Sequence, residues 1–228
     1  MKIPKYFVTI GIVAVLISFC PAQMRGDIVF NTLGPGDTYN QSAGTFVGFQ
    51  TQSGGPFFEI AAQFTAQTSG NLATVDLGLT FVSGTTPGSV SAFLYGDAAG
   101  SPDNADQTLL GSGTPTGAFT TTNNSLLSLT VSGVPVTMGS VYWLVVKPVN
   151  PLSQHTIWNA SSPAVTGLKQ FTTNDSTWQP ASNNVLPAFR LETGLAPVPD
   201  SGDTLLIMLG SVAALLVVQG VLRNERSS

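Results

Sequence analysis

Leu72 to Val82, with the sequence LATVDLGLTFV, alternates apolar and polar side chains along most of its length. A period of two places successive side chains on opposite faces of a β-strand. One face of this strand would carry Val75, Leu77, Leu79 and Phe81, and the other Thr74, Asp76, Gly78 and Thr80. The stretch therefore predicts an antiparallel strand with one side buried.

Short apolar runs of this kind recur through residues 27–192, and turn-forming clusters such as 53–56 (SGGP), 86–88 (TPG) and 132–133 (SG) separate them. Further strands are expected at Phe57–Ala66, Val90–Tyr95, Leu126–Val131, Val141–Lys147, Thr45–Phe49, Thr156–Trp158, Gly167–Phe171 and Ala188–Glu192. About eight to ten short strands without intervening helices favour an all-β fold. We expect an antiparallel β-sandwich of jelly-roll-like form, since no internal repeat indicates a propeller or solenoid.

The composition excludes several classes of function. Charged residues make up 9% of the chain, against roughly 25% in an average domain. Residues 23–197 contain four basic and nine acidic side chains, so they present no basic patch for nucleic acid. The single cysteine, Cys20, lies in the N-terminal apolar segment, so the domain that follows has no disulfide and no thiolate.

Residues 1–22 have the three parts of a secretory signal peptide. Lys2 and Lys5 form a positive start, residues 6–19 form an uncharged apolar run, and the small Ala22 suits cleavage after it. An uncleaved N-terminal anchor is the alternative. A lipoprotein signal would need a small residue before Cys20, and Phe19 is large.

The C-terminal segment, residues 198–228, predicts a membrane anchor. Thr204 to Leu222 carries no charge and would form a transmembrane helix of about 28 Å, close to the thickness of a bilayer core. Arg223 and Arg226 follow it as a stop-transfer signal, which places the residue 23–192 domain outside the cytoplasm. Residues 193–197 form a short linker.

The order of motif, apolar helix and basic end resembles the PEP-CTERM class of bacterial sorting signals. The motif is Val198, Pro199, Asp200, Ser201 and Gly202, which matches the VPDSG variant at every position. The resemblance implies processing by an exosortase as partner enzyme and transfer to the cell surface or the extracellular matrix. A GPI signal is the rival interpretation, but it would need a polar spacer of about 8–12 residues before the apolar tail.

Short fragments of the domain resemble the "choice-of-anchor" ectodomains found before such sorting signals. The fragments are residues 62–65 (AQFT), 90–97 (VSAFLYGD), 100–102 (GSP) and 138–144 (MGSVYWL). This resemblance implies an extracellular β-rich module without an assigned chemistry.

Three groups of residues are candidate sites, each with a plainer structural explanation. Asp97, Asp103 and Asp106 are expected in one loop and could hold Ca²⁺ through oxygen ligands, although solvated acidic residues are common in such loops. His155 could serve a hydrolase, but no Gly-X-Ser-X-Gly motif accompanies it, and a lone histidine suits a plain surface.

The third group is aromatic. Trp143, Trp158 and Trp178, with Tyr142, could stack on sugars as in a carbohydrate-binding module. Trp143 lies within an apolar strand and is expected in the core, which leaves Trp158 and Trp178 as the better candidates. The sequence thus predicts a surface-sorted, non-enzymatic protein without a cofactor, associated with extracellular polysaccharide, or alternatively a tethered carbohydrate-binding module.

Overall fold

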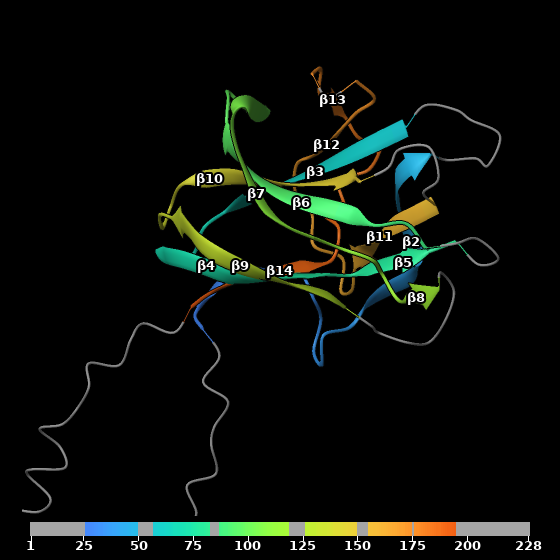
Figure 1. Ribbon diagram of the computed structural model, residues 1–228, viewed down its shortest axis with the longest axis horizontal. Helices are drawn as coiled ribbons and strands as arrows, with labels where there is room; N and C mark the ends of the chain where they lie inside the picture. Colours follow the sequence, from blue (N-terminus) through green and yellow to red (C-terminus); the bar gives the residue numbers. More distant parts are fainter. Residues whose placement is uncertain are drawn as a thin grey trace, which may run out of the picture.

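The computed structural model describes residues 26–49, 57–82, 87–118, 126–149, 155–174 and 176–194, and these residues contain no helix. They form two layers, a sheet of four strands and a sheet of ten (Figure 1). All pairings among the described strands are antiparallel except the parallel contact of β5 (Leu79–Phe81) with β8 (Gly117–Ala118). The expected all-β, antiparallel fold is confirmed.

The small sheet has the order β1 (Ile28–Asn31), β14 (Phe189–Thr193), β4 (Gly70–Leu77) and β9 (Leu127–Val136). The large sheet has the order β7 (Pro102–Gly113), β6 (Val90–Asp97), β10 (Val141–Pro148), β3 (Phe57–Thr65), β2 (Tyr39–Phe49), β11 (His155–Ser161), β5 and β8. In addition, β12 (Lys169–Thr172) pairs with β3, and β13 (Gln179–Pro180) pairs with β12.

The single strand predicted over Leu72 to Val82 is two strands, which is a correction. β4 ends at Leu77 in the small sheet, and β5 begins at Leu79 in the large sheet. Gly78 makes the crossing, and its amide donates to the carbonyl of Ala188 at 2.9 Å. A Cβ at Gly78 would lie 2.8 Å from the Cβ of Ala188, closer than two carbon atoms pack, so the crossing requires glycine.

The other predicted strands each overlap an observed one. Four observed strands were not expected from the sequence, namely β1, β7, β8 and β13. The longest of these, β7, covers the second half of the segment expected to be an acidic loop, with Asp103 and Asp106. Thr193, the first residue of the predicted linker, is the last residue of β14.

The main core lies between the two sheets and is centred on Phe189 of β14. Its ring lies 5.4 Å from Phe30 of β1, 6.2 Å from Phe64 of β3 and 5.8 Å from Trp158 of β11, measured between ring centroids. Buried aromatic side chains each remove about 150–250 Å² from water, so these contacts between the sheets are a large part of the folding energy.

A second, smaller core covers the opposite face of the large sheet. Ala61, Tyr95, Trp143 and Val145 are fully buried there, with Phe93 and Trp178 packed against them. They alternate along β3, β6 and β10 with residues of the main core, as the period of two requires. The centre of the large sheet is therefore buried on both faces.

Arg190 of β14 lies on the face of the small sheet that is turned away from the main core, and three carboxylates neutralise it. It contacts Asp37 and Asp76, and its Nε lies 2.8 Å from Oε1 of Glu192. Burial alone would lower the pKa of Arg190, but the hydrogen bonds with Asp37 and Asp76 outweigh it and raise that pKa above its usual value. The guanidinium thus stays charged and ties the loop before β2 to β4 and β14.

No helix long and apolar enough to cross a membrane occurs among the described residues. The predicted signal peptide (1–22), sorting motif (198–202), transmembrane helix (204–222) and the two arginines after it lie outside these residues.

Replacing Arg190 by Met should lower the free energy of unfolding by about 3–5 kcal/mol, because Asp76 and Glu192 would stay buried without their cation. Asp37→Asn should cost less, since the Asp37 side chain is 35% exposed and water can replace the contact. Urea denaturation of the three proteins measures the difference. Equal losses in the two variants would contradict this account of the cluster.

Candidate functional site

Lys169 of β12 is buried without a described carboxylate beside it. Its side chain reaches β2 and the segment before β14, where Nζ donates to Oγ1 of Thr45 at 3.1 Å and to Oδ1 of Asn183 at 2.6 Å. Only 7% of the residue is exposed. Burial lowers the pKa of Lys169, since the ammonium loses water of hydration without gaining an opposite charge.

Two pockets adjoin at Lys169, and we call them together the Lys169 cleft. The first has a volume of about 390 Å³ and the second about 560 Å³. Both are lined by Gly44, Thr45, Lys169 and Asn183, so the contacts of the lysine form their common boundary. Volumes of roughly 300–1,000 Å³ are typical of sites for small molecules.

The two pockets have mixed linings and differ mainly in their aromatic content. The first is lined by polar residues, which are Asn40, Ser42 and Ser161, and by small apolar residues, which are Ala43, Ala160, Ala164, Val185 and Pro187. The second is lined mainly by apolar side chains, which are Phe46, Phe58, Ile60, Phe171 and Pro180. Among the described lining residues of both, Lys169 is the only one that carries a charge.

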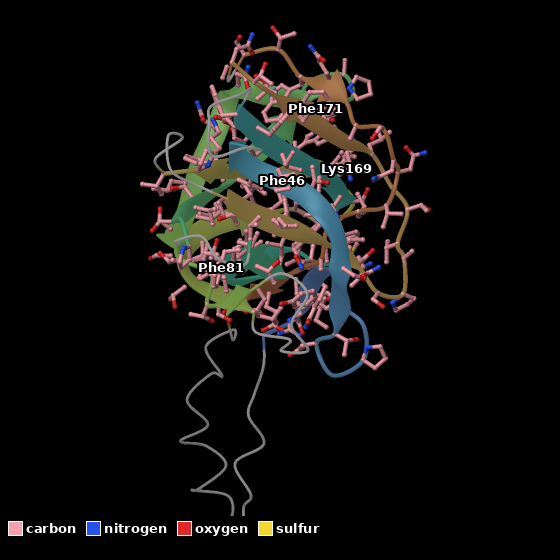
Figure 2. All side chains as sticks on the ribbon, turned by 90° about the vertical axis from the view of Figure 1, so that its right-hand side faces the viewer. Phe46, Phe81, Lys169 and Phe171 are labelled. Atoms are coloured by element: carbon pink, nitrogen blue, oxygen red, sulfur yellow. The ribbon has the colours of Figure 1, made fainter. Side chains whose placement is uncertain are left out.

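The strand geometry explains why these side chains meet. Lys169 and Phe171 are two residues apart on β12, so they share a face, and they lie opposite Ala62 and Ile60 of β3. Ile60 and Ala62 belong to the main core. Lys169 and Phe171 therefore lie on the same face of the large sheet as the main core, where that face reaches the surface of the molecule. Figure 2 shows Phe46 on β2 and Lys169 and Phe171 on β12, on the side that faces the viewer.

The aromatic residues predicted as a sugar-stacking surface do not form one. Trp143 is fully buried, as expected, but Trp158 is also fully buried, and its Nε1 donates to the carbonyl of Ala188 at 3.0 Å. The prediction of Trp158 as an exposed platform is wrong, because β11 directs its ring into the main core. Trp178 is half-buried and packs edge-on against Tyr95. Tyr142 stacks with Phe64 at 5.8 Å between ring centroids.

The acidic candidates for Ca²⁺ do not share one loop, which is a second correction. Asp97 ends β6, whereas Asp103 and Asp106 belong to β7, because the chain turns back through residues 98–101 and pairs at once. No cluster of three or more acidic, histidine or cysteine side chains suited to a metal ion occurs in the described part of the chain.

The carboxylate of Asp97 is instead held by protein donors. Its Oδ1 accepts from Nε1 of Trp143 at 2.7 Å and from Nε2 of Gln63 at 3.0 Å, and its Oδ2 from the amide of Gly100 at 3.2 Å. The bond from Trp143 is the main cause that lowers the pKa of Asp97, with smaller contributions from Gly100 and Gln63. These bonds cap the second core, which is a structural role.

His155 begins β11, but its side chain lies outside what the structure describes, so the hydrolase alternative stays untested. The sorting motif from Val198 to Gly202 likewise lies beyond the described residues.

Lys169 was not expected from the sequence as a site. A usable signal was present, since it is one of four basic residues between 23 and 197 and lies within a predicted strand.

No protein-family model matches the chain, and no curated protein is significantly similar to it. Among solved structures, the chain is similar to the cysteine protease and lectin-like domains of Cwp84, a surface layer associated protein of Clostridium difficile. The match has 14% identity and a TM-score of 0.43, and it covers 60% of this chain and 32% of that one. A likeness at this level assigns neither a fold family nor an activity.

Replacing Lys169 by Met should leave the free energy of unfolding unchanged or raise it by up to about 2 kcal/mol. The reason is that a desolvated cation is removed while no described carboxylate loses a partner, and methionine has a similar length. Urea denaturation measures this, with Arg190→Met as the matched removal of a buried cation. A loss of several kcal/mol would show that Lys169 serves stability.

Proposed function

We propose that this chain is an exported, non-enzymatic protein, anchored in a membrane or sorted to the cell surface, whose β-domain binds glycan in the Lys169 cleft. On this proposal the two layers form a jelly-roll-like β-sandwich that acts as a tethered binding module. The observation that carries the binding part is the cleft itself, in which a pocket with amide and hydroxyl groups and an aromatic pocket meet at one cation.

The chemistry of the lining supports a saccharide ligand. A sugar ring offers hydroxyl groups at its edge and an apolar face of C–H groups. Asn40, Ser42 and Asn183 provide donors and acceptors for the first, and Phe171 and Phe46 provide apolar contact for the second. The cleft is lined by strands and short segments paired to them, so its shape exists before a ligand binds.

The sequence supports the location. An apolar segment near each end, with basic residues on the side that stays in the cytoplasm, gives one consistent topology with the domain outside. The VPDSG motif adds an exosortase as processing partner through its resemblance to PEP-CTERM signals. The domain would then lie in an extracellular polysaccharide matrix, and that polysaccharide would also be its ligand.

A structural matrix protein without a ligand is the second candidate. The double burial of the large sheet favours it, because β3, β6 and β10 give a rigid domain that would serve as a spacer in a matrix. Glycan binding in the cleft is the property that separates the two.

Glycan binding can be measured with the purified full-length chain on an array of bacterial polysaccharides. Phe171→Ala should weaken binding about tenfold, because the ring is a wall of the apolar pocket. Leu168→Ala is the matched control, since Leu168 is 54% exposed and does not line the cleft. If no glycan is retained by the wild-type chain, the binding part of the proposal is wrong and the matrix candidate remains.

The sorting part can be followed with a tagged protein in a host that has an exosortase. Pro199→Ala with Asp200→Ala should stop processing and leave the uncleaved chain in the membrane fraction, because the enzyme would no longer recognise its motif. Ser227→Ala, beyond the motif and the helix, should be processed like the wild type. Unchanged processing of the double variant would mean that the segment is a plain anchor.

A further inference from the structure

We infer that the Lys169 cleft selects an acidic saccharide, and that the Lys169 ammonium binds a carboxylate on the sugar. This inference rests on the proposed glycan-binding function and deepens it, because it names the class of glycan and the residue that recognises it.

The Lys169 ammonium has more hydrogen-bond donors than it uses within the described residues. A lysine ammonium has three N–H donors. Two of those on Lys169 are used, by Thr45 and by Asn183, and the third has no acceptor among the described residues. Because Lys169 lines the cleft, this third donor is available to a ligand oxygen there.

Lys169 also differs from the other buried cations of the described residues in having no carboxylate partner there. Lys147 lies 3.5 Å from a carboxylate oxygen of Glu59, and Arg190 contacts three carboxylates. Lys169 has only a hydroxyl and an amide oxygen as described partners. Among the described residues, two of these three cations thus have carboxylate partners, and the third, Lys169, lines the cleft.

The linings of the two pockets indicate the rest of the ligand. A fatty acid would fill the apolar pocket around Phe58 and Phe171 but would leave the polar groups of Asn40 and Ser42 in the other pocket unused. A uronic acid within a polysaccharide has a carboxylate, hydroxyl groups and an apolar ring face, so it suits both pockets and the lysine between them. Charge-assisted hydrogen bonds are about twice as strong as neutral ones, which makes the carboxylate the selective group.

Long-range attraction does not contribute to this selectivity. Residues 23–197 have five more acidic than basic side chains, so the domain as a whole repels an anion. Recognition must therefore come from the contact with Lys169 inside the cleft, where salt screens little. We expect binding of the acidic saccharide to persist in 0.5 M salt, unlike adsorption to a basic surface.

The experiment measures calorimetric affinity of the full-length chain for oligosaccharides of uronic acids, for the same oligosaccharides after methyl esterification, and for neutral oligosaccharides. Esterification removes the negative charge from the ligand and leaves the protein unaltered. The wild type should bind the acid about tenfold or more tightly than the ester. Lys169→Met should bind the acid and the ester within about threefold of each other, because the charge contact is gone.

Each outcome separates the inference from the function on which it rests. Equal affinity of the wild type for acid and ester would overturn the role of Lys169 and leave glycan binding intact. Binding of neutral glycans alone would likewise overturn the role of Lys169 and leave glycan binding intact. Poly-glutamate is measured as a polymer that has carboxylates but no sugar rings. If it binds as tightly as the acidic oligosaccharide, or more tightly, the ligand is not a saccharide. Failure to bind any saccharide would overturn the proposed function, and the inference with it.

Discussion

The backbone of Gly78 joins the two sheets where the chain passes from one to the other. Its amide donates to Ala188, the amide of Ala188 donates to Asn159, and the amide of Asn159 donates back to Gly78, at 2.9, 2.8 and 2.9 Å. This closed set of three bonds fixes β11 beside the end of β14. Because β2 pairs with β11, with Thr45 opposite Trp158, the same bonds also determine where Thr45 meets Lys169. The cleft therefore depends on a contact at the centre of the fold.

The three buried cations among the described residues of this domain differ in whether a carboxylate neutralises them. Arg190 and Lys147 lie beside carboxylates, and Lys147 also lies 5.2 and 5.3 Å from the ring centroids of Phe93 and Tyr95. Both cations are neutralised by carboxylates of the protein. Lys169 costs stability by its burial and has only neutral described partners. A cost of this kind at a pocket is typical of a residue that is kept for binding.

Much of the fold could be predicted from the sequence, because the apolar runs that form β3, β6 and β10 are long and are bounded by turn residues. The break at Gly78 could not be predicted. The alternation of Leu72 to Val82 continues through it, and only the approach of Ala188, which lies just before β14 and about 110 residues later, requires a crossing there. The polar sequence of β7 likewise gave no strand signal, since most of its side chains are not buried and pairing with β6 holds the strand.

The candidate site was less predictable than the fold. Tryptophans are the obvious signal for sugar binding, but their position depends on tertiary contacts, and Trp158 is buried in the main core. Lys169 is recognised as a candidate site only because no described carboxylate lies beside it. This property depends on tertiary packing and cannot be inferred from the spacing of residues in the sequence. The terminal segments show the reverse case. Their order of charge and apolar residues is a local pattern, so the sequence alone predicts the topology.

The most direct test of the account is to map chemical-shift changes on the isotope-labelled chain during titration with an acidic oligosaccharide. The account predicts changes concentrated at the residues common to both pockets, which are Gly44, Thr45, Lys169 and Asn183. Changes centred on Trp178 and Asn104, over the second core, would contradict it.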